Sequence, residues 1–418
     1  MSQEFSARFR AAAKFLRVFA KWLLIASVTG AAGGLIGAAF HLSVDGAGAL
    51  RESFPRLIWL LPAAGVLIAL IYRYTHLESE GTNAVIDSIH LGERIPLALV
   101  PVIFASTVLT HLCGGSAGRE GAALQIGGGL GWSMGRLFRL DEKDMRLVTL
   151  CGMSALFSAL FGTPLTATIF ALEVISVGVV YYSGLVPCLT AALAAYGVTR
   201  LFDIAPTRFV TEAPALSADI LWRVALLGIA CAGMSIVFCV VMHKSEHFIS
   251  KTVKNPYLRA LLGGFAIIAL TYLCGTTDYN GAGTQVISRA ISEGEARPAA
   301  FALKLVFTAI TLGSGFRGGE VVPTFFIGAT LGCVLGPLLG IPAGFAAAVG
   351  LVALFCGAVN CPVASVILSV ELFGSGGVVL FAVACAISYM LSGYTGLYSS
   401  QKIMYSKLRA EFIDIHAK

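Results

Sequence analysis

The chain has 418 residues, of which 57% are hydrophobic and only 12% are charged, and its mean hydropathy is +0.84. Soluble domains carry about twice that share of charged residues, so the composition excludes an ordinary water-soluble domain. The 47 glycines fit packed transmembrane helices, because small residues allow backbones to approach closely. We therefore predict an all-α, polytopic membrane protein.

Basic residues account for the net charge of +6 and flank the apolar part of the chain at both ends. Positively charged flanks stay on the cytoplasmic side of a membrane. We therefore expect both termini in the cytoplasm, a location in the cell inner membrane, contact with the lipid bilayer, and no nucleic-acid partner. Residues 1–21 are predicted to form an amphipathic helix on the inner membrane face, residues 22–400 the transmembrane domain, and residues 401–418 a short cytoplasmic tail. The flanking residues are Arg8, Arg10, Lys14, Arg17 and Lys21, then Lys402, Lys407, Arg409 and Lys418.

Apolar runs follow one another along the chain, and several are shorter than the roughly 20 residues that a spanning helix needs. Short runs interrupted by Gly and Pro predict broken helices, which membranes tolerate where the irregular backbone is buried or lines a cavity. The 10 cysteines lie scattered without a CxxC pair, so we expect buried thiols, no metal and no cofactor. The runs cover residues 22–44, 57–75, 95–113, 122–138, 147–160, 164–180, 184–202, 219–242, 258–275, 299–313, 321–340, 343–358, 362–373 and 376–393.

The interruptions recur in matched pairs, which indicates an internal repeat. Arg119 matches Arg317, Pro164 matches Pro362 and Glu173 matches Glu371, each 198 positions apart. Ile126-Gly127 matches Ile327-Gly328 at a spacing of 201. We predict one repeat over about 22–205 and a second over about 215–400. Duplicated halves with broken helices are typical of secondary transporters, whose ion sites lie where half-helices begin.

Three glycine-rich breaks are each predicted to begin a helix: residues 80–84, 118–122 and 318–323. A helix N-terminus offers unpaired N–H groups and a partial positive charge, and several converging ends bind an anion without a full positive charge. The glycines that let an ion approach the backbone are Gly81, Gly118, Gly121, Gly318 and Gly319.

Glu120 places a carboxylate at one of these helix starts. When ionised it could occupy the anion's own position, and when protonated it could move away, so it would be both gate and proton carrier. The alternative is a helix cap or a buried partner for Arg119. An ionisable residue inside a membrane domain is a functional hypothesis by default.

The chain resembles the CLC chloride channels and transporters over about residues 20–405. Gly118-Arg119-Glu120-Gly121 with Gln125-Ile126-Gly127-Gly128 is similar to the family's signature, and Gly318–Pro323 stands where the family has a second anion loop. Further matches are Phe161–Leu165, Asn360–Val363 and Tyr394–Ser399. The resemblance implies inverted-topology repeats and a homodimer with one pathway in each subunit.

Glu320 departs from the chloride members, which are usually apolar there, and Val174 stands where chloride exchangers have a proton-passing glutamate. Gly-Gly-Glu-Val-x-Pro resembles the subgroup of fluoride/proton antiporters. The resemblance implies fluoride export, not enzyme catalysis, with Glu120 as gate and Glu320 as second proton-transfer group. A structural acid hydrogen-bonded to Arg317 is the alternative for Glu320. The anion would bind main-chain N–H groups around Thr82, Asn83, Glu320 and Val321 and the hydroxyls of Thr82 and Tyr398. The alternative function is a chloride/proton exchanger or chloride channel.

Other polar residues are interpreted as structural. We expect Arg119 and Arg317 to pair with acids or helix ends, Glu173 and Glu371 to cap helices or bridge them, and Gln125 to bond between helices. His243-Lys244-Ser245-Glu246-His247 matches the inverted zinc-peptidase pattern H-x-x-E-H, so a membrane metallopeptidase is a remote alternative. A membrane scaffold is a third, although a scaffold has no use for duplicated helix breaks.

Overall fold

The computed structural model describes residues 2–78 and 81–418, with side chains from Ala12 onward outside that gap. Residue 80, in the first predicted break, and the side chains of Arg8 and Arg10 lie outside the described part. Seven described helices are long and apolar enough to cross a membrane, and several of the others are shorter and apolar. The predicted all-α membrane class with broken helices is confirmed.

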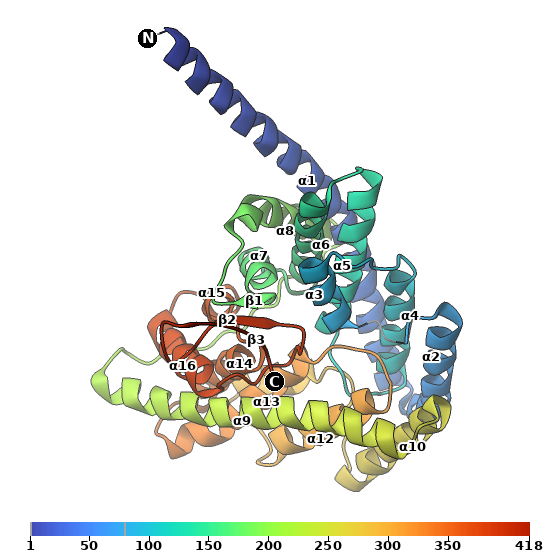
Figure 1. Cartoon of the computed structure of the whole chain (residues 1–418). Helices are drawn as coiled ribbons and strands as arrows, with labels where there is room; N and C mark the ends of the chain where they lie inside the picture. The colour runs from blue at the N-terminus through green and yellow to red at the C-terminus, as the bar shows by residue number, and fades with distance from the viewer. Residues whose placement is uncertain (1, 79–80) are drawn as a thin grey trace.

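The helices of the first half recur in the second half in the same order (Figure 1). Thus α3 corresponds to α11, α5 to α13, and α7 to α15. The first half contains α1 (Ser2–Ser53), η1 (Pro55–Leu60), α2 (Leu61–Thr75), α3 (Thr82–Leu91), α4 (Leu99–Leu112), α5 (Glu120–Leu137), α6 (Glu142–Phe161), α7 (Pro164–Glu173), η2 (Tyr182–Gly184) and α8 (Leu185–Arg200). The second contains α9 (Ala218–Thr252), α10 (Pro256–Cys274), α11 (Thr284–Ser292), α12 (Ala300–Gly313), α13 (Val321–Leu338), α14 (Ala343–Val359), α15 (Pro362–Phe373) and α16 (Val378–Leu391).

Local sequence explains where the short helices begin and end. Pro164 and Pro362 occupy the first position of α7 and α15, where a missing N–H costs nothing. The helices before them end at residues in the left-handed conformation, Gly162 with φ of +69° and Asn360 with φ of +58°. The breaks therefore have the same construction in both halves.

The ends of α7 and α15 cap each other. Glu173 accepts hydrogen bonds from the N–H groups of Val363 (3.1 Å) and Ala364 (2.8 Å), at the start of α15. Glu371 accepts them from Leu165 (3.0 Å) and Thr166 (2.8 Å), at the start of α7. Each helix thus ends beside the beginning of the other, which is the antiparallel arrangement of an inverted repeat. Both acids bridge helices, as predicted.

Glycines bring the central helices into backbone contact. A Cβ added to Gly152 would lie 2.1 Å from the carbonyl oxygen of Gly127, and one added to Gly350 would lie 2.2 Å from that of Gly328. The crossing of α5 with α6 and that of α13 with α14 therefore both require glycine. These close contacts fix where α5 and α13 lie in the molecule, and therefore where their N-termini lie.

The two ends of the chain differ from the expectation. The helix expected over residues 1–21 is the first part of α1, which continues without a boundary at residue 21 and projects from the rest of the molecule (Figure 1). The tail is ordered and adds a small sheet in which β1 (Ser176–Val177) pairs parallel with β2 (Lys402–Tyr405), and β2 pairs antiparallel with β3 (Phe412–His416). The tail is thereby bound to the segment that follows α7.

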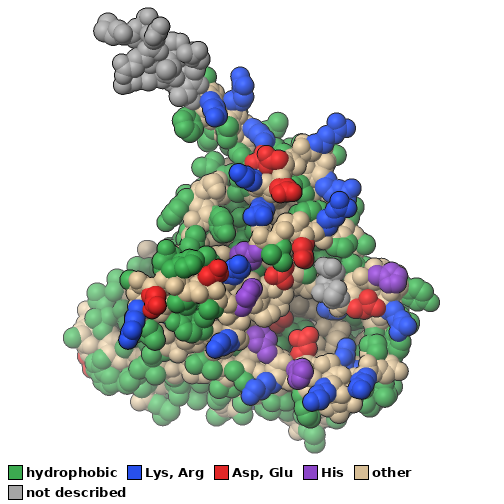
Figure 2. Space-filling model, viewed as in Figure 1, with side chains coloured by type: hydrophobic (Ala, Val, Ile, Leu, Met, Phe, Trp, Pro, Cys, Tyr) green, Lys and Arg blue, Asp and Glu red, His purple; other side chains and the backbone are tan. Residues whose placement is uncertain are grey.

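Polar and apolar side chains are separated on the surface. Figure 2 shows hydrophobic side chains over much of the flanks, while acidic, basic and histidine side chains gather across the middle of the face toward the viewer. This distribution fits a belt of lipid contact around a polar centre.

Candidate functional site

The glycine-rich loops before α5 and α13 meet at the centre of the molecule. The N–H of Gly118 donates to the carbonyl of Gly319, and the N–H of Gly319 donates to the carbonyl of Gly118, both at 2.7 Å. A Cβ on Gly319 would lie 2.4 Å from the backbone nitrogen of Gly121, so the contact needs glycine. The two loops thus bring the N-termini of α5 and α13 together.

The start of α3 joins them. Thr82 Oγ1 donates to the carbonyl of Gly121 at 3.4 Å, and Gln125 Nε2 donates to Thr82 Oγ1 at 3.2 Å. All three predicted helix starts are confirmed, since α3 begins at Thr82, α5 at Glu120 and α13 at Val321. The bond expected of Gln125 between helices is confirmed as well. Three helix N-termini converge, which is the arrangement that favours an anion.

The Glu120 carboxylate lies at this point and is fully buried. Its Oε2 accepts from the N–H of Arg119 at 2.9 Å and from the N–H of Val322 at 3.3 Å, so it reaches across to the first turn of α13. Its Oε1 has no hydrogen-bond partner among the described groups and lies 4.0 Å from Arg119 Nε. The carboxylate thus contacts the amide of Val322, next to the Glu320–Val321 amides that the sequence analysis assigns to the anion.

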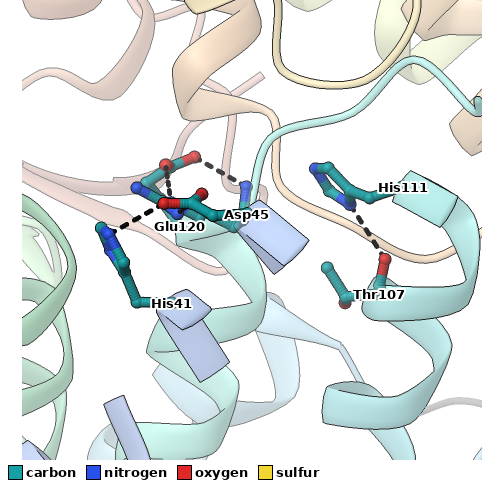
Figure 3. A network of polar contacts seen from close by, with 6 residues as sticks. His41, Asp45, Thr107, His111 and Glu120 are labelled. Atoms are coloured by element: carbon teal, nitrogen blue, oxygen red, sulfur yellow. Dashed lines mark hydrogen bonds and ion pairs between the residues drawn. The ribbon is translucent and has the colours of Figure 1, made fainter. Parts of the chain in front are cut away.

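Arg119 connects the Glu120 carboxylate with a cavity. Its Nη1 donates to Asp45 Oδ1 at 2.7 Å, and Asp45 Oδ2 lies 2.9 Å from His41 Nε2 (Figure 3). Asp45 and Arg119 help line a cavity of about 640 Å³, which we call the vestibule. Arg119 pairs with acids, as expected.

Arg317 behaves differently from its sequence match. Its guanidinium lies over the ring of Tyr72, 4.0 Å from the centroid. Because the second loop is three residues longer, the position before α13 is taken by Glu320, whereas the position before α5 is taken by Arg119. Glu320 is thus the structural counterpart of Arg119, with the opposite charge.

Glu320 is half-buried, and its Oε2 has no hydrogen-bond partner in the described part of the chain. A bond to Arg317 was the structural alternative for this residue, but that guanidinium stacks on Tyr72 instead. Buried polar atoms in proteins are nearly all hydrogen-bonded, so an unpartnered carboxylate oxygen next to Glu120 calls for an explanation.

Tyr398 is buried, and its hydroxyl also lacks a partner among the described residues. The segment that carries it reaches the start of α3, where the N–H of Ser400 donates to Asn83 Oδ1 at 3.2 Å. The Asn83 side chain therefore holds this segment. A free tyrosine hydroxyl can donate a hydrogen bond to a bound anion.

A buried polar cluster in the tail was missed by sequence reasoning. Gln401 Nε2 donates to the carbonyls of Val174 (2.8 Å), at the end of α7, and Val359 (2.9 Å), at the end of α14, so it joins the two halves of the fold. Lys407 Nζ donates to Asn360 Oδ1 at 2.5 Å, and burial lowers the pKa of Lys407 to about 8. The cluster fixes the backbone on both sides of the Tyr398 segment. The only sequence signal was that polar residues directly follow the last apolar run.

The zinc-peptidase alternative gains no support. His243 Nε2 lies 3.0 Å from the carbonyl of Leu397, and His247 is exposed. The described residues contain no group of three or more His, Cys, Asp or Glu side chains that could hold a metal.

Comparison with known proteins agrees with this geometry. The family profile described as "Voltage gated chloride channel" matches residues 64–393. The chain belongs to this family, the CLC family. It is 38% identical to the "Chloride/fluoride channel protein" of Pseudomonas syringae pv. tomato over 94% of this chain and 88% of that protein. It is 26% identical to the "H(+)/Cl(-) exchange transporter ClcA" of Yersinia pestis, over 90% and 86% of the two chains. A solved structure of a CLC-type fluoride/proton antiporter is 32% identical, with a TM-score of 0.88 over 91% of this chain and 98% of that one.

Proposed function

We propose that this CLC protein is a fluoride/proton antiporter, which exports fluoride from the cytoplasm and admits protons in exchange. The two relatives whose names include fluoride, one of them together with chloride, are 38% and 32% identical to it, whereas the chloride exchanger is 26% identical. The observation that carries the mechanism is the Glu120 carboxylate, which is buried at the start of α13 and bonded to the N–H of Val322.

An ionised Glu120 occupies the position that suits an anion. Protonation removes its charge and weakens its charge-assisted hydrogen bonds to the N–H groups of Arg119 and Val322. The neutral side chain then leaves, and fluoride takes its place among the same donors. One position held in turn by a carboxylate and by fluoride links proton movement to anion movement in the opposite direction.

Fluoride is small and strongly hydrated, so donors must replace its water shell. We assign this role to the N–H of Val322, the main-chain N–H groups at Thr82–Asn83 and Glu320–Val321, and the hydroxyls of Thr82 and Tyr398. The unpartnered hydroxyl of Tyr398 supports its assignment. Gly81, Gly118, Gly121, Gly318 and Gly319 keep the approach to these donors open. We assign to Glu320 the transfer of protons to and from Glu120. Its Oε2, like the hydroxyl of Tyr398, has no hydrogen-bond partner among the described residues.

We also propose a membrane location, an orientation and an oligomeric state for the protein. The basic flanks support a cytoplasmic location for both termini and an inner-membrane location for the protein. We propose a homodimer in the lipid bilayer, with a separate pathway in each subunit. The exposed apolar side chains of α1, such as Leu35 (54% exposed) and Leu42 (51%), fit contact with lipid.

The experiment compares proteoliposomes that contain the parent protein or Glu120→Gln, with a fluoride electrode outside and a pH-sensitive dye inside. Glutamine keeps the shape but carries no titratable proton, so we expect the variant to move fluoride without protons. Glu371→Gln is the matched control, because Glu371 is a helix-end acid away from the site, and we expect it to keep proton coupling. Intact coupling in Glu120→Gln would remove Glu120 from the mechanism.

A chloride/proton exchanger is the second candidate, because the Yersinia pestis relative is named for that activity and covers most of the chain. The same proteoliposomes separate the two candidates when chloride replaces fluoride. Fluoride efflux much faster than chloride efflux supports the first candidate. Equal or faster chloride efflux supports the second candidate, and Glu320 then needs a structural explanation.

A further inference from the structure

The end of α9 carries polar residues that the proposed transport mechanism does not use, among them the histidines and the acid of His243–His247. The helix packs against α12, α13 and α14 in the second half of the fold (Figure 1). Lys244, Lys251 and Lys254 surround its end, and basic segments stay on the cytoplasmic side of a membrane. In the orientation that we propose, this end of α9 therefore faces the cytoplasm.

One face of α9 borders the segment that carries Tyr398. Cys239 Sγ donates to the carbonyl of Ala358 at 3.7 Å, and one turn further on His243 Nε2 lies 3.0 Å from the carbonyl oxygen of Leu397. Because a carbonyl only accepts hydrogen bonds, Nε2 of this ring is the donor. The face thus follows the chain from the interior to the residue directly before Tyr398.

A neighbouring face of α9 packs against the end of α12. A Cβ added to Gly313, the last residue of α12, would lie 3.0 Å from Ile249 Cδ1 and 3.4 Å from the backbone nitrogen of Glu246. The second loop, residues 314–320, starts directly after Gly313 and ends at Glu320. This part of α9 therefore lies where the second loop begins.

Glu246 lies between these two faces of α9. It follows His243 by three residues and precedes Ile249 by three, and residues three apart are neighbours on a helix surface. Its side chain is exposed. Glu246 is therefore placed at the cytoplasmic end of α9, between the Tyr398 segment and the second loop.

The charge of Glu246 acts on Glu320. Of the charged groups that affect the Glu320 carboxylate, Glu246 has the largest effect, ahead of Arg317 and Glu120. Glu320 in turn acts on Cys239, which lies on the face of α9 described above. Two neighbouring carboxylates oppose each other's ionisation, so a proton is held readily by one of them while the other is charged.

Cations near this end of α9 leave Glu246 unpaired. Arg259 of α10 and Arg317 of the second loop are on elements that surround it, and Lys244 and His247 are on its own helix. None of the ion pairs between described residues includes Glu246 or either of these arginines. A carboxylate that is exposed and unpaired can exchange protons with water without first breaking an ion pair.

We propose that Glu246 passes protons between Glu320 and the cytoplasm. When a proton enters, the O–H bond of the Glu320 carboxyl group breaks and a new O–H bond forms on the Glu246 carboxylate, directly or through a bridging water molecule. Glu246 then gives the proton to cytoplasmic water and is charged again. Glu246 is thus the inner end of a proton route whose other members are Glu320 and Glu120.

This inference rests on the proposed function, and the test begins with fluoride/proton exchange by the parent protein in proteoliposomes. A parent protein that moves no protons with fluoride would reject the proposed function, and with it the inference. Given exchange by the parent, we expect Glu246→Gln to slow fluoride efflux and proton uptake together by at least about tenfold, because the variant lacks a proton-transfer group. Equal rates in Glu246→Gln and the parent would overturn the inference alone.

Two variants show whether the lost acid is the cause. Glu246→Asp keeps a carboxyl group and should recover most of the rate. Glu142→Gln is the matched control, since Glu142 is an exposed acid at the start of α6, and it should exchange at the parent rate. A rate in Glu246→Asp as low as that in Glu246→Gln would contradict the proposed proton transfer.

The last measurement separates proton transfer from a structural role. In the Glu120→Gln background we expect fluoride to move without protons, so adding Glu246→Gln should leave the fluoride flux unchanged. An unchanged flux supports the assignment, because a change in the fold or in the anion path would slow fluoride in both backgrounds. A tenfold slower fluoride flux in the double variant would overturn it.

Discussion

The loops that precede α5 and α13 have the same backbone role but opposite chemistry. Each brings a helix N-terminus to the centre, and they bond to each other through Gly118 and Gly319. Immediately before the helix, however, one loop carries Arg119 and the other Glu320. The two facing helix ends are thus alike in backbone, but at the start of α5 a cation accompanies the Glu120 carboxylate, whereas the start of α13 carries a second acid.

The largest expected effect comes from breaking the contact between the loops. In Gly319→Ala the new Cβ would lie 2.4 Å from the nitrogen of Gly121 and 2.8 Å from that of Glu120. Because these neighbouring atoms belong to the backbone, they cannot move without distorting the loop. We therefore expect the variant to lose about 3 kcal/mol or more of stability and to show no transport. Thermal unfolding in detergent measures the loss.

Gly81→Ala is its matched control, because no described atom lies within 4 Å of the added Cβ and the φ of Gly81 is −159°. We expect its stability to change by less than about 1 kcal/mol. Equal unfolding temperatures for the two variants would show that the loops do not need the close contact.

A smaller effect is expected from removing the acid in the second loop. Glu320→Gln keeps the shape at the start of α13 but takes away a titratable group, and we expect coupled exchange to slow by about a hundredfold. Arg317→Lys tests the neighbouring charge, which stacks on Tyr72, and should slow exchange much less. The measurement is the rate of coupled fluoride and proton flux in proteoliposomes. Equal rates for Glu320→Gln and the parent protein would show that Glu320 is a structural acid.

The smallest effect concerns the tail. The folded protein lowers the pKa of Lys407 to about 8 from its usual 10.5, so between these values the unfolded chain binds more protons. Stability contributed by this residue should therefore rise as the pH increases from 8 to 10.5. Thermal unfolding of the parent protein relative to Lys407→Met should show this rise. A difference that stays flat or falls over that interval would contradict the burial of a charged lysine.

Most of the helix boundaries could be predicted from the sequence, because they are determined by residues at the boundaries themselves. Glycine-rich breaks marked the starts of α3, α5 and α13, and the duplicated Pro164 and Pro362 marked those of α7 and α15. The bridging roles of Glu173 and Glu371 followed from their places at the ends of apolar runs.

Other features depend on contacts between distant segments. Such contacts leave no periodic pattern in the sequence from which they could be predicted. Examples are the stacking of Arg317 on Tyr72, the pairing of residues 176–177 with the tail, and the hydrogen bonds of Gln401 to Val174 and Val359. Glu246 lies among charged residues after an apolar run, and only its place between the Tyr398 segment and the second loop distinguishes it from a solvated helix end. The three-residue difference between the loops was visible as a change of spacing, but its consequence for Arg119 and Glu320 required the structure.

The most direct test of the account is fluoride-driven proton movement by the parent protein. Proteoliposomes are loaded with fluoride, diluted into fluoride-free buffer at equal pH, and held at zero membrane potential. The account predicts that protons enter as fluoride leaves, so the lumen becomes acidic against the developing pH gradient, and that chloride loaded in the same way has little effect. Fluoride efflux without acidification, or equal acidification by chloride, would contradict it.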